Sequence, residues 1–498
     1  MLFNSGEFLL FFPIVTAMYF LLPKKLKNFW LLLSSYYFYM CWNAKYALLM
    51  LFSTGITYLS GLALEWIKKS TVEERKRTLR KKLVVATSFA LNLLVLFFFK
   101  YFNFSLDILQ KVFALARINL EVPHFDIILP VGISFFTFQA LSYTMDVYRD
   151  DIYAEKNFFE YALFVSFFPQ LVAGPIERSK NLLKQLAVPQ KFNFENAREG
   201  FLLMLWGFFL KLVLADRLAV FVNTVYGDHM TYSGWYLVVA TVFFAFQIYC
   251  DFYGYSVIAK GAAKILGIDL MENFNAPYFS QSVAEFWRRW HISLSSWFRD
   301  YLYFPLGGSK KGKVRKQLNR MIVFLTSGLW HGAQISYVAW GALNGVYQVI
   351  GDGLKPIRKK AIHILHLNQK SAGHKVLRVL CTFALICFTW IFFRADGVQH
   401  AIAIIKQIFT VRNPWVLVND ALYSCGLDRK NFQLAIIGVI VLLVADCFKY
   451  KGIKIHQKIV EQDYWVRWLV IVGSILVILV FGLWGPAYDA SSFVYFQF

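Results

Sequence analysis

The chain has 498 residues, of which 58% are hydrophobic, 19% aromatic and only 16% charged, and its formal net charge is +22. Soluble globular chains carry roughly 25% charged residues, so this composition excludes an ordinary soluble protein, and the high hydrophobicity excludes a disordered one. The apolar residues come in blocks of about 17–25, the length of a helix that crosses a bilayer. We therefore predict an all-α polytopic membrane protein rather than an outer-membrane barrel, whose segments alternate over roughly ten residues.

The apolar blocks predict a series of membrane spans. Residues 101–116 are a weaker segment, for which we expect an interfacial helix. No internal repeat is visible, so we expect a single membrane domain over residues 1–498. The expected spans are residues 2–22, 29–43, 46–67, 83–100, 127–147, 158–174, 200–222, 235–259, 321–350, 380–393, 432–448 and 468–484.

The distribution of charge indicates a topology. More than half of the 52 Lys and Arg residues, with only three acidic residues, lie in loops between apolar blocks. This pattern is typical of cytoplasmic loops that face anionic lipid, whereas a nucleic-acid site would gather its charge on one domain. We expect no nucleic-acid partner, and we expect the tail after residue 484 to lie outside. The basic loops are residues 24–27, 68–82, 309–320, 351–379 and 449–458.

The block at residues 321–350 does not fit a simple crossing. Both flanking loops are basic and should be cytoplasmic, yet about thirty residues at 1.5 Å each are too short to cross a ~30 Å core twice. Either one span breaks the charge rule, or the chain enters and returns partway, as Gly328, Gly332, Gly341 and Gly345 would permit. Irregular backbone at membrane depth is tolerated only where protein buries it or where it lines a cavity. The block is therefore a candidate functional region.

The segment at residues 276–306 is rich in Trp but too polar to span. It carries Glu285, Arg288, Arg289 and His291. Two interpretations stay open: an interfacial helix with aromatic anchors, or a half-buried helix that lines a polar cavity. The second is favoured because the charges fall on several helical faces.

Two of the nine histidines, His331 and His291, lie in apolar or aromatic surroundings. A titratable residue inside the membrane is costly and is functional by default, although a hydrogen bond between helices is the alternative. Imidazole accepts a proton from a hydroxyl at neutral pH. No H-E-x-x-H spacing, Walker loop, G-x-G-x-x-G or G-x-S-x-G motif occurs, so we expect no metal site.

Other polar residues lie within the expected spans, among them Gln139, Gln247, Asp251 and Asn344. Each one alone is best explained by hydrogen bonding within a helix bundle. Their number suggests a hydrated interior cavity.

Several motifs together resemble a known family. These are Phe167-Phe-Pro-Gln-Leu-Val-Ala-Gly-Pro-Ile-Glu-Arg178, Trp287-Arg-Arg-Trp-His-Ile-Ser-Leu-Ser-Ser-Trp-Phe-Arg-Asp-Tyr301 and Ser327-Gly-Leu-Trp-His-Gly-Ala333, with residues 130–149 and 247–254. The chain resembles the membrane-bound O-acyltransferase (MBOAT) superfamily, most closely its alginate and peptidoglycan O-acetyltransferase branch. The resemblance extends over the whole chain, with its motif core at about 130–345. It implies a ring of about 11–13 transmembrane helices, with re-entrant and interfacial helices, around a central tunnel.

The resemblance also implies roles for residues. His331 matches the invariant histidine of the family and His291 its second motif histidine, so both are expected to be catalytic. The tail at 485–498 resembles an aromatic motif whose tyrosine, here Tyr495, is a possible acyl relay; an interfacial anchor is the alternative. The candidates for lining the tunnel or stabilising an oxyanion are Asn344, Gln247, Asp251, Gln139, Trp330, Arg288 and Arg289.

The implied function is transmembrane O-acyl transfer in the bacterial cytoplasmic membrane. We expect an acetyl group from a cytoplasmic thioester, acetyl-CoA, to reach an extracytoplasmic acceptor, with no resident cofactor. A serine-hydrolase-like acyltransferase outside the cell is the expected partner, and a cell-envelope polysaccharide or exopolysaccharide the final substrate. Two alternatives stay open. One is D-alanyl transfer from an acyl carrier protein for teichoic acid modification, and the other is a non-enzymatic transporter of lipid or acyl groups.

Overall fold

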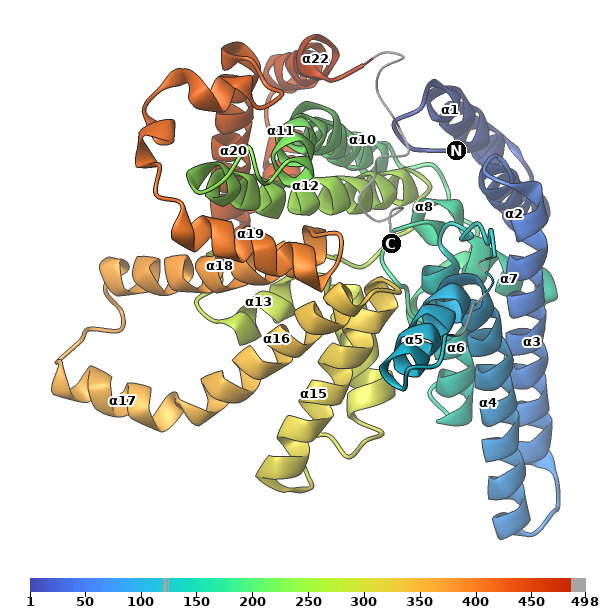
Figure 1. Cartoon of the computed structure of the whole chain (residues 1–498). Helices are drawn as coiled ribbons and strands as arrows, with labels where there is room; N and C mark the ends of the chain where they lie inside the picture. Colours follow the sequence, from blue (N-terminus) through green and yellow to red (C-terminus); the bar gives the residue numbers. More distant parts are fainter. Residues whose placement is uncertain (120–122, 124, 485–498) are drawn as a thin grey trace. The chain divides into compact units, whose positions relative to one another are not determined.

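A computed structural model describes residues 1–119, 123 and 125–484 (Figure 1). Throughout these residues the regular structure is helical and no strand occurs, which confirms the all-α prediction. The chain divides into two compact units, and the division falls inside helices α10 (Phe194–Phe208) and α12 (Trp235–Ile265). The expectation of a single membrane domain stays a prediction.

The first unit comprises Met1–Phe201 together with Ile258–Met271. Its helices begin at side chains that suit helix N-termini: Ser5 accepts a hydrogen bond from the Phe8 amide, and Asn43 accepts one from the Lys45 amide. Such caps satisfy amides that lack a partner within the helix. The elements, before the shared α10, are α1 (Gly6–Leu21), α2 (Lys24–Met40), α3 (Ala44–Lys69), α4 (Glu74–Leu96), the π-helix η1 (Phe97–Tyr101), α5 (Phe102–Leu115), α6 (Ile133–Tyr148), α7 (Phe158–Ser166), α8 (Phe168–Leu171) and α9 (Ser179–Leu186).

The second unit comprises Leu202–Val257 and the chain from Glu272 onward. It also contains parts of α10 and α12, which run through both units. The rest of this unit includes two pairs of helices that are consecutive in the chain and three long apolar helices. Its elements are the π-helix η2 (Phe209–Ala215), α11 (Asp216–Gly227), η3 (Pro277–Phe279), α13 (Val283–Arg289), α14 (Ile292–Phe298), the π-helix η4 (Arg299–Tyr303), α15 (Gly312–His331), α16 (Ile335–Gly353), α17 (Lys355–Ile364), α18 (Ala372–Arg394), α19 (Val398–Thr410), η5 (Pro414–Leu417), η6 (Asp420–Ser424), α20 (Arg429–Tyr450), α21 (Ile455–Val460) and α22 (Tyr464–Phe481).

Six helical segments in the described part of the chain are long and apolar enough to cross a membrane. Their burial differs widely: 83% of the most apolar stretch of α12 is buried inside protein, against 6% for α22. Exposed apolar surface of that extent is stable only against lipid, so the protein is a multi-pass membrane protein. The six are α3, α4 to α5 as one run (Glu74–Leu115), α12, α18, α20 and α22.

Several expected spans form shorter elements instead. The span predicted at 158–174 is broken at Phe167 into α7 and α8, and the one at 200–222 passes through the π-helix η2. A π-helix interrupts the regular i to i−4 hydrogen bonds of an α-helix and changes which side chains share one face of the helix. Hydropathy alone does not reveal such breaks, because the side chains on both sides of them are equally apolar.

The block at 321–350 is a helical hairpin. Helices α15 and α16 lie side by side and are joined by a short turn after His331 (Figure 1). Two glycines bring their backbones together: a Cβ on Gly328 would collide with the Tyr337 carbonyl oxygen, and a Cβ on Gly341 with the Phe324 carbonyl oxygen. Of the two alternatives for this block, the structure has the one in which the chain reverses.

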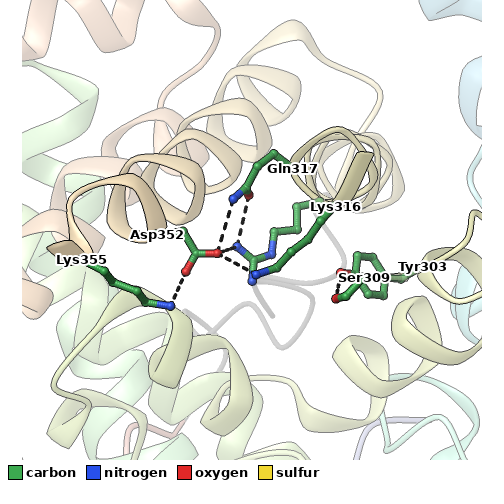
Figure 2. Close-up of polar contacts among 7 residues, drawn as sticks. Tyr303, Ser309, Lys316, Gln317, Asp352 and Lys355 are labelled. Atoms are coloured by element: carbon green, nitrogen blue, oxygen red, sulfur yellow. Dashed lines mark hydrogen bonds and ion pairs between the residues drawn. The ribbon is translucent and has the colours of Figure 1, made fainter. Parts of the chain in front are cut away.

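The open end of the hairpin joins the two basic loops. Asp352 of α16 binds Lys316, 3.0 Å away, and Arg320, both on α15, and Lys355 at the start of α17. Figure 2 shows the Asp352 carboxylate between Lys316 and Lys355. Burial raises the pKa of Asp352. Hydrogen bonds from Lys355, Lys316 and Arg320 outweigh this effect and hold the pKa of Asp352 well below its ordinary value. Both basic loops therefore lie at one end of the hairpin, as the second alternative predicts.

The segment at 276–306 is not the single helix that either interpretation assumed. It forms η3, α13, α14 and η4, with a sharp turn at Trp290 and His291. His291 has a φ of 44°, in the left-handed region that non-glycine residues rarely occupy. The hydrophobic pattern could not reveal this turn, because the aromatic residues on both sides of it are buried.

Candidate functional site

His331 and His291 lie close together in the second unit. His331 is the last residue of α15, and His291 occupies the turn between α13 and α14. Their ring centroids are 6.4 Å apart, and the two residues are only 4% and 1% exposed. Two histidines separated by 40 positions in the sequence are thus brought together in the interior.

Aromatic rings surround the imidazole of His331. Trp340 of α16 meets it edge-on at 5.1 Å, Phe393 of α18 lies at 5.4 Å, and the adjacent Trp330 at 5.0 Å between ring centroids. Trp330 also lies 6.0 Å from the His291 ring. The packing fixes the ring between three elements and places it where water is scarce, so a proton acceptor here acts in a weakly polar environment.

The conformation of His291 is held by Asn273. The Asn273 carbonyl accepts a hydrogen bond of 2.9 Å from the Ile292 amide, and its side-chain oxygen accepts one of 2.5 Å from the Ser293 hydroxyl. The ring of Phe252 packs against the His291 ring at 4.7 Å. Burial lowers the pKa of His291 to about 3, so its imidazole is neutral at pH 7.

Lys449 of α20 fixes the segment that contains Asn273. Its ammonium group lies 3.1 Å from the Glu272 carboxylate and donates a 2.6 Å hydrogen bond to the Phe274 carbonyl. Lys449 thus binds the residue on each side of Asn273. No sequence motif pointed to Asn273 or Lys449, because their contacts join positions far apart in the chain.

Given the acyl transfer that the sequence resemblance implies, replacing Asn273 by alanine is expected to lower the turnover rate about tenfold or more with little change in KM. The substitution removes the side-chain acceptor from Ser293 beside His291 and leaves a buried group unpaired, at a cost of about 1–3 kcal/mol. Initial rates of acyl transfer check this.

The matched control for that experiment is Asn275→Ala. The contacts of Asn275 with Arg289 use its main-chain atoms, which survive the substitution, so its rate should be close to that of the wild type. Equal rates for the two variants would contradict a positioning role for Asn273.

Asn344 and Trp330 belong to the same cluster as the two histidines. The Asn344 side-chain oxygen accepts a 3.1 Å hydrogen bond from the Trp287 indole, and its amide nitrogen donates a 2.9 Å bond to the Trp340 carbonyl. Asn344 therefore supports Trp340, which packs against His331. Trp287 and Trp340, 5.5 Å apart, are members of the cluster that the sequence did not single out.

Three further candidates from the sequence are Asp251, Gln247 and Gln139. Asp251 pairs with Lys211 at 2.7 Å, and Lys211 also pairs with Asp216, so the charge of the Asp251 carboxylate is compensated. Gln247 is buried on α12. Gln139 belongs to the first unit, where its amide donates a hydrogen bond to the Phe164 carbonyl.

The two arginines beside His291 also differ. Arg289 pairs with Glu285 at 3.0 Å and stacks on Tyr450, whereas Arg288 is exposed. Tyr495 lies outside the described residues. Within the described ranges no group of three or more His, Cys, Asp or Glu residues has the arrangement of a metal site. The functional roles of all these residues stay predictions.

Comparison with known proteins identifies the family. The model of the MBOAT, membrane-bound O-acyltransferase family, matches residues 152–393. A probable alginate O-acetylase AlgI of Pseudomonas syringae is 36% identical over 80% of this chain and 74% of that protein, and one of Pseudomonas aeruginosa 35% identical over 89% and 80%. A peptidoglycan O-acetyltransferase of Helicobacter pylori is 29% identical over 100% of this chain and 98% of its own length. The chain therefore belongs to the MBOAT family and is a membrane-bound O-acyltransferase.

Proposed function

We propose that this enzyme transfers an acetyl group from a cytoplasmic thioester, acetyl-CoA, to a hydroxyl acceptor outside the membrane, for O-acetylation of a cell-envelope polysaccharide or exopolysaccharide. The observation that carries the proposal is the buried pair of His331 and His291, 6.4 Å apart, at the closed end of the α15–α16 hairpin. The names of the relatives support acetyl as the group transferred. The cytoplasmic membrane of a bacterium is the proposed location.

In the proposed mechanism His331 acts as general base. The acceptor oxygen attacks the thioester carbonyl carbon while His331 takes its proton; the carbon–sulfur bond then breaks, and the proton passes to the departing thiolate. The products are an O-acetyl ester and free coenzyme A. General-base action of this kind contributes about 10²–10⁴-fold. The neutral His291 is suited to donate a hydrogen bond to the oxygen that becomes negative in the tetrahedral intermediate.

The chemistry requires a thioester donor, and purified protein tests this directly. Incubation with acetyl-CoA labelled in the acetyl group should release coenzyme A and transfer the label to an acceptor. A D-alanyl thioester on a carrier protein should be a much poorer donor. Release of D-alanine label in place of acetyl label would support the teichoic acid alternative, and cleavage of neither thioester would favour a transporter.

We further propose that Tyr495 receives the acetyl group and that a serine-hydrolase-like partner outside the membrane takes it onward. Deleting residues 492–498 should abolish O-acetylation of the polysaccharide. Tyr495→Phe keeps the aromatic ring and removes only the hydroxyl, so it should also abolish acetylation if the tyrosine is a relay. Normal acetylation in the Tyr495→Phe strain would show that the ring serves only as an anchor.

A further inference from the structure

Helix α17 (Lys355–Ile364) has an apolar stripe that the described part of the protein leaves uncovered. Ile357, Ala361, Ile364 and Leu365 follow the i, i+4, i+7, i+8 spacing of one helical face. The three large residues Ile357, Ile364 and Leu365 are 65%, 61% and 64% exposed. A stripe of this kind requires an apolar environment outside the chain.

The other faces of α17 are cationic. Arg358, Lys359, Lys360 and His363 are exposed around the stripe. No Asp or Glu occurs between Asp352 and Asp396, so the positive charge of these side chains is not compensated within this stretch. The helix combines an apolar stripe with a cationic surface, which is the composition of helices that lie in a membrane interface.

The position of α17 suits such an interface. It follows α16 directly and precedes α18 (Ala372–Arg394), one of the helices long and apolar enough to cross the membrane (Figure 1). Only the loop at 365–371 separates α17 from that helix. The stripe is therefore near the level where a crossing helix enters the lipid.

We propose that α17 binds anionic phospholipid, with its apolar stripe among the acyl chains and Arg358, Lys359 and Lys360 on the headgroup phosphates. Lipid supplies both an apolar layer and phosphate groups to one ten-residue helix, whereas an acidic protein surface would leave the stripe exposed.

Binding at α17 also reaches the α15–α16 hairpin. Lys355, the first residue of α17, pairs with Asp352, which holds Lys316 and Arg320. Lipid-bound α17 thus anchors the end of the hairpin opposite His331. This binding does not depend on the reaction proposed above.

Hydrogen–deuterium exchange tests the proposal on the full-length protein in lipid nanodiscs. Exchange of the amides at 357–365 should slow about tenfold when phosphatidylglycerol is added to phosphatidylcholine. The triple variant Arg358→Gln, Lys359→Gln, Lys360→Gln should lose this difference. Each cation near an anionic surface raises the membrane affinity about fivefold, so three cations together raise it about a hundredfold. Exchange in α12, followed in the same samples, reports whether the variant is folded.

The matched control removes the same charge from the neighbouring basic loop. Lys310, Lys311 and Lys313 are exposed and lie outside α17, so changing all three to glutamine should leave the protection of α17 by phosphatidylglycerol intact. Equal exchange in the two lipids, or equal loss of protection in the two triple variants, would overturn the proposal. Protection that arises only when an acidic acyl carrier protein is added to phosphatidylcholine discs would also overturn it, in favour of protein docking.

Discussion

Acetyl transfer should fall by about 10²–10⁴-fold when His331 is replaced by alanine, the usual contribution of a general base. The His331 ring is held by Trp340 and Phe393, and in the proposed mechanism alanine leaves the acceptor hydroxyl without a group to take its proton. The pH dependence adds a second readout, because any residual rate should rise with hydroxide concentration and show no plateau. Initial rates of coenzyme A release across pH check both.

The control for this experiment is His374→Ala. His374 lies in the first turn of α18, where its main-chain amide bonds to Ser371, and its side chain has no part in the histidine cluster. Its rate should match that of the wild type. A His331→Ala enzyme with the full rate, or an equal loss in the two variants, would mean that His331 is not the base.

Gly341→Ala should destabilise the protein and abolish activity, because one methyl group forces the hairpin apart. The added Cβ would collide with the Phe324 carbonyl oxygen and crowd the Gly328 Cα, and a backbone cannot move away as a flexible side chain can. Overpacking of this kind costs about 1–3 kcal/mol or more. The midpoint of thermal unfolding in detergent should fall accordingly.

Gly351→Ala is the matched change on the same helix. Nothing lies within 4 Å of a Cβ at Gly351, and alanine in a helix is about 0.5–1 kcal/mol more favourable than glycine, so the midpoint should hold or rise. An unchanged midpoint for Gly341→Ala would contradict the close packing of α15 against α16.

Much of the fold could be predicted from residue composition and spacing. The positions of α3, α12, α18, α20 and α22 follow from apolar length, which reflects a direct physical requirement of the bilayer. The conflict between two basic loops and a block too short to cross twice left two alternatives for residues 321–350, and the structure shows the reversal. The ion pairs of Asp352 with Lys316 and Lys355 join cations of both loops at the open end of this hairpin.

The candidate site could be predicted only in part. Both histidines stood out because titratable groups are rare in apolar segments, and Asn344 was marked as polar within a span. The left-handed turn at His291 could not be foreseen, since it depends on hydrogen bonds that Asn273, 18 positions earlier, accepts from residues 292 and 293, and on Lys449, far along the chain. Contacts between distant positions leave no local pattern in the sequence. For the same reason the pairing of Asp251 with Lys211 was not visible.

We propose that the acetyl group crosses the membrane through a reaction at His331. Inside-out membrane vesicles that enclose both the acceptor polysaccharide and the proposed partner acyltransferase should be supplied with labelled acetyl-CoA, which does not cross the bilayer, on the outside only. We predict O-acetyl label on the enclosed polysaccharide with the wild-type enzyme, and none with His331→Ala. Labelling of the enclosed polysaccharide by the His331→Ala vesicles, or the absence of label with the wild type while coenzyme A is released, would contradict transfer across the membrane at His331.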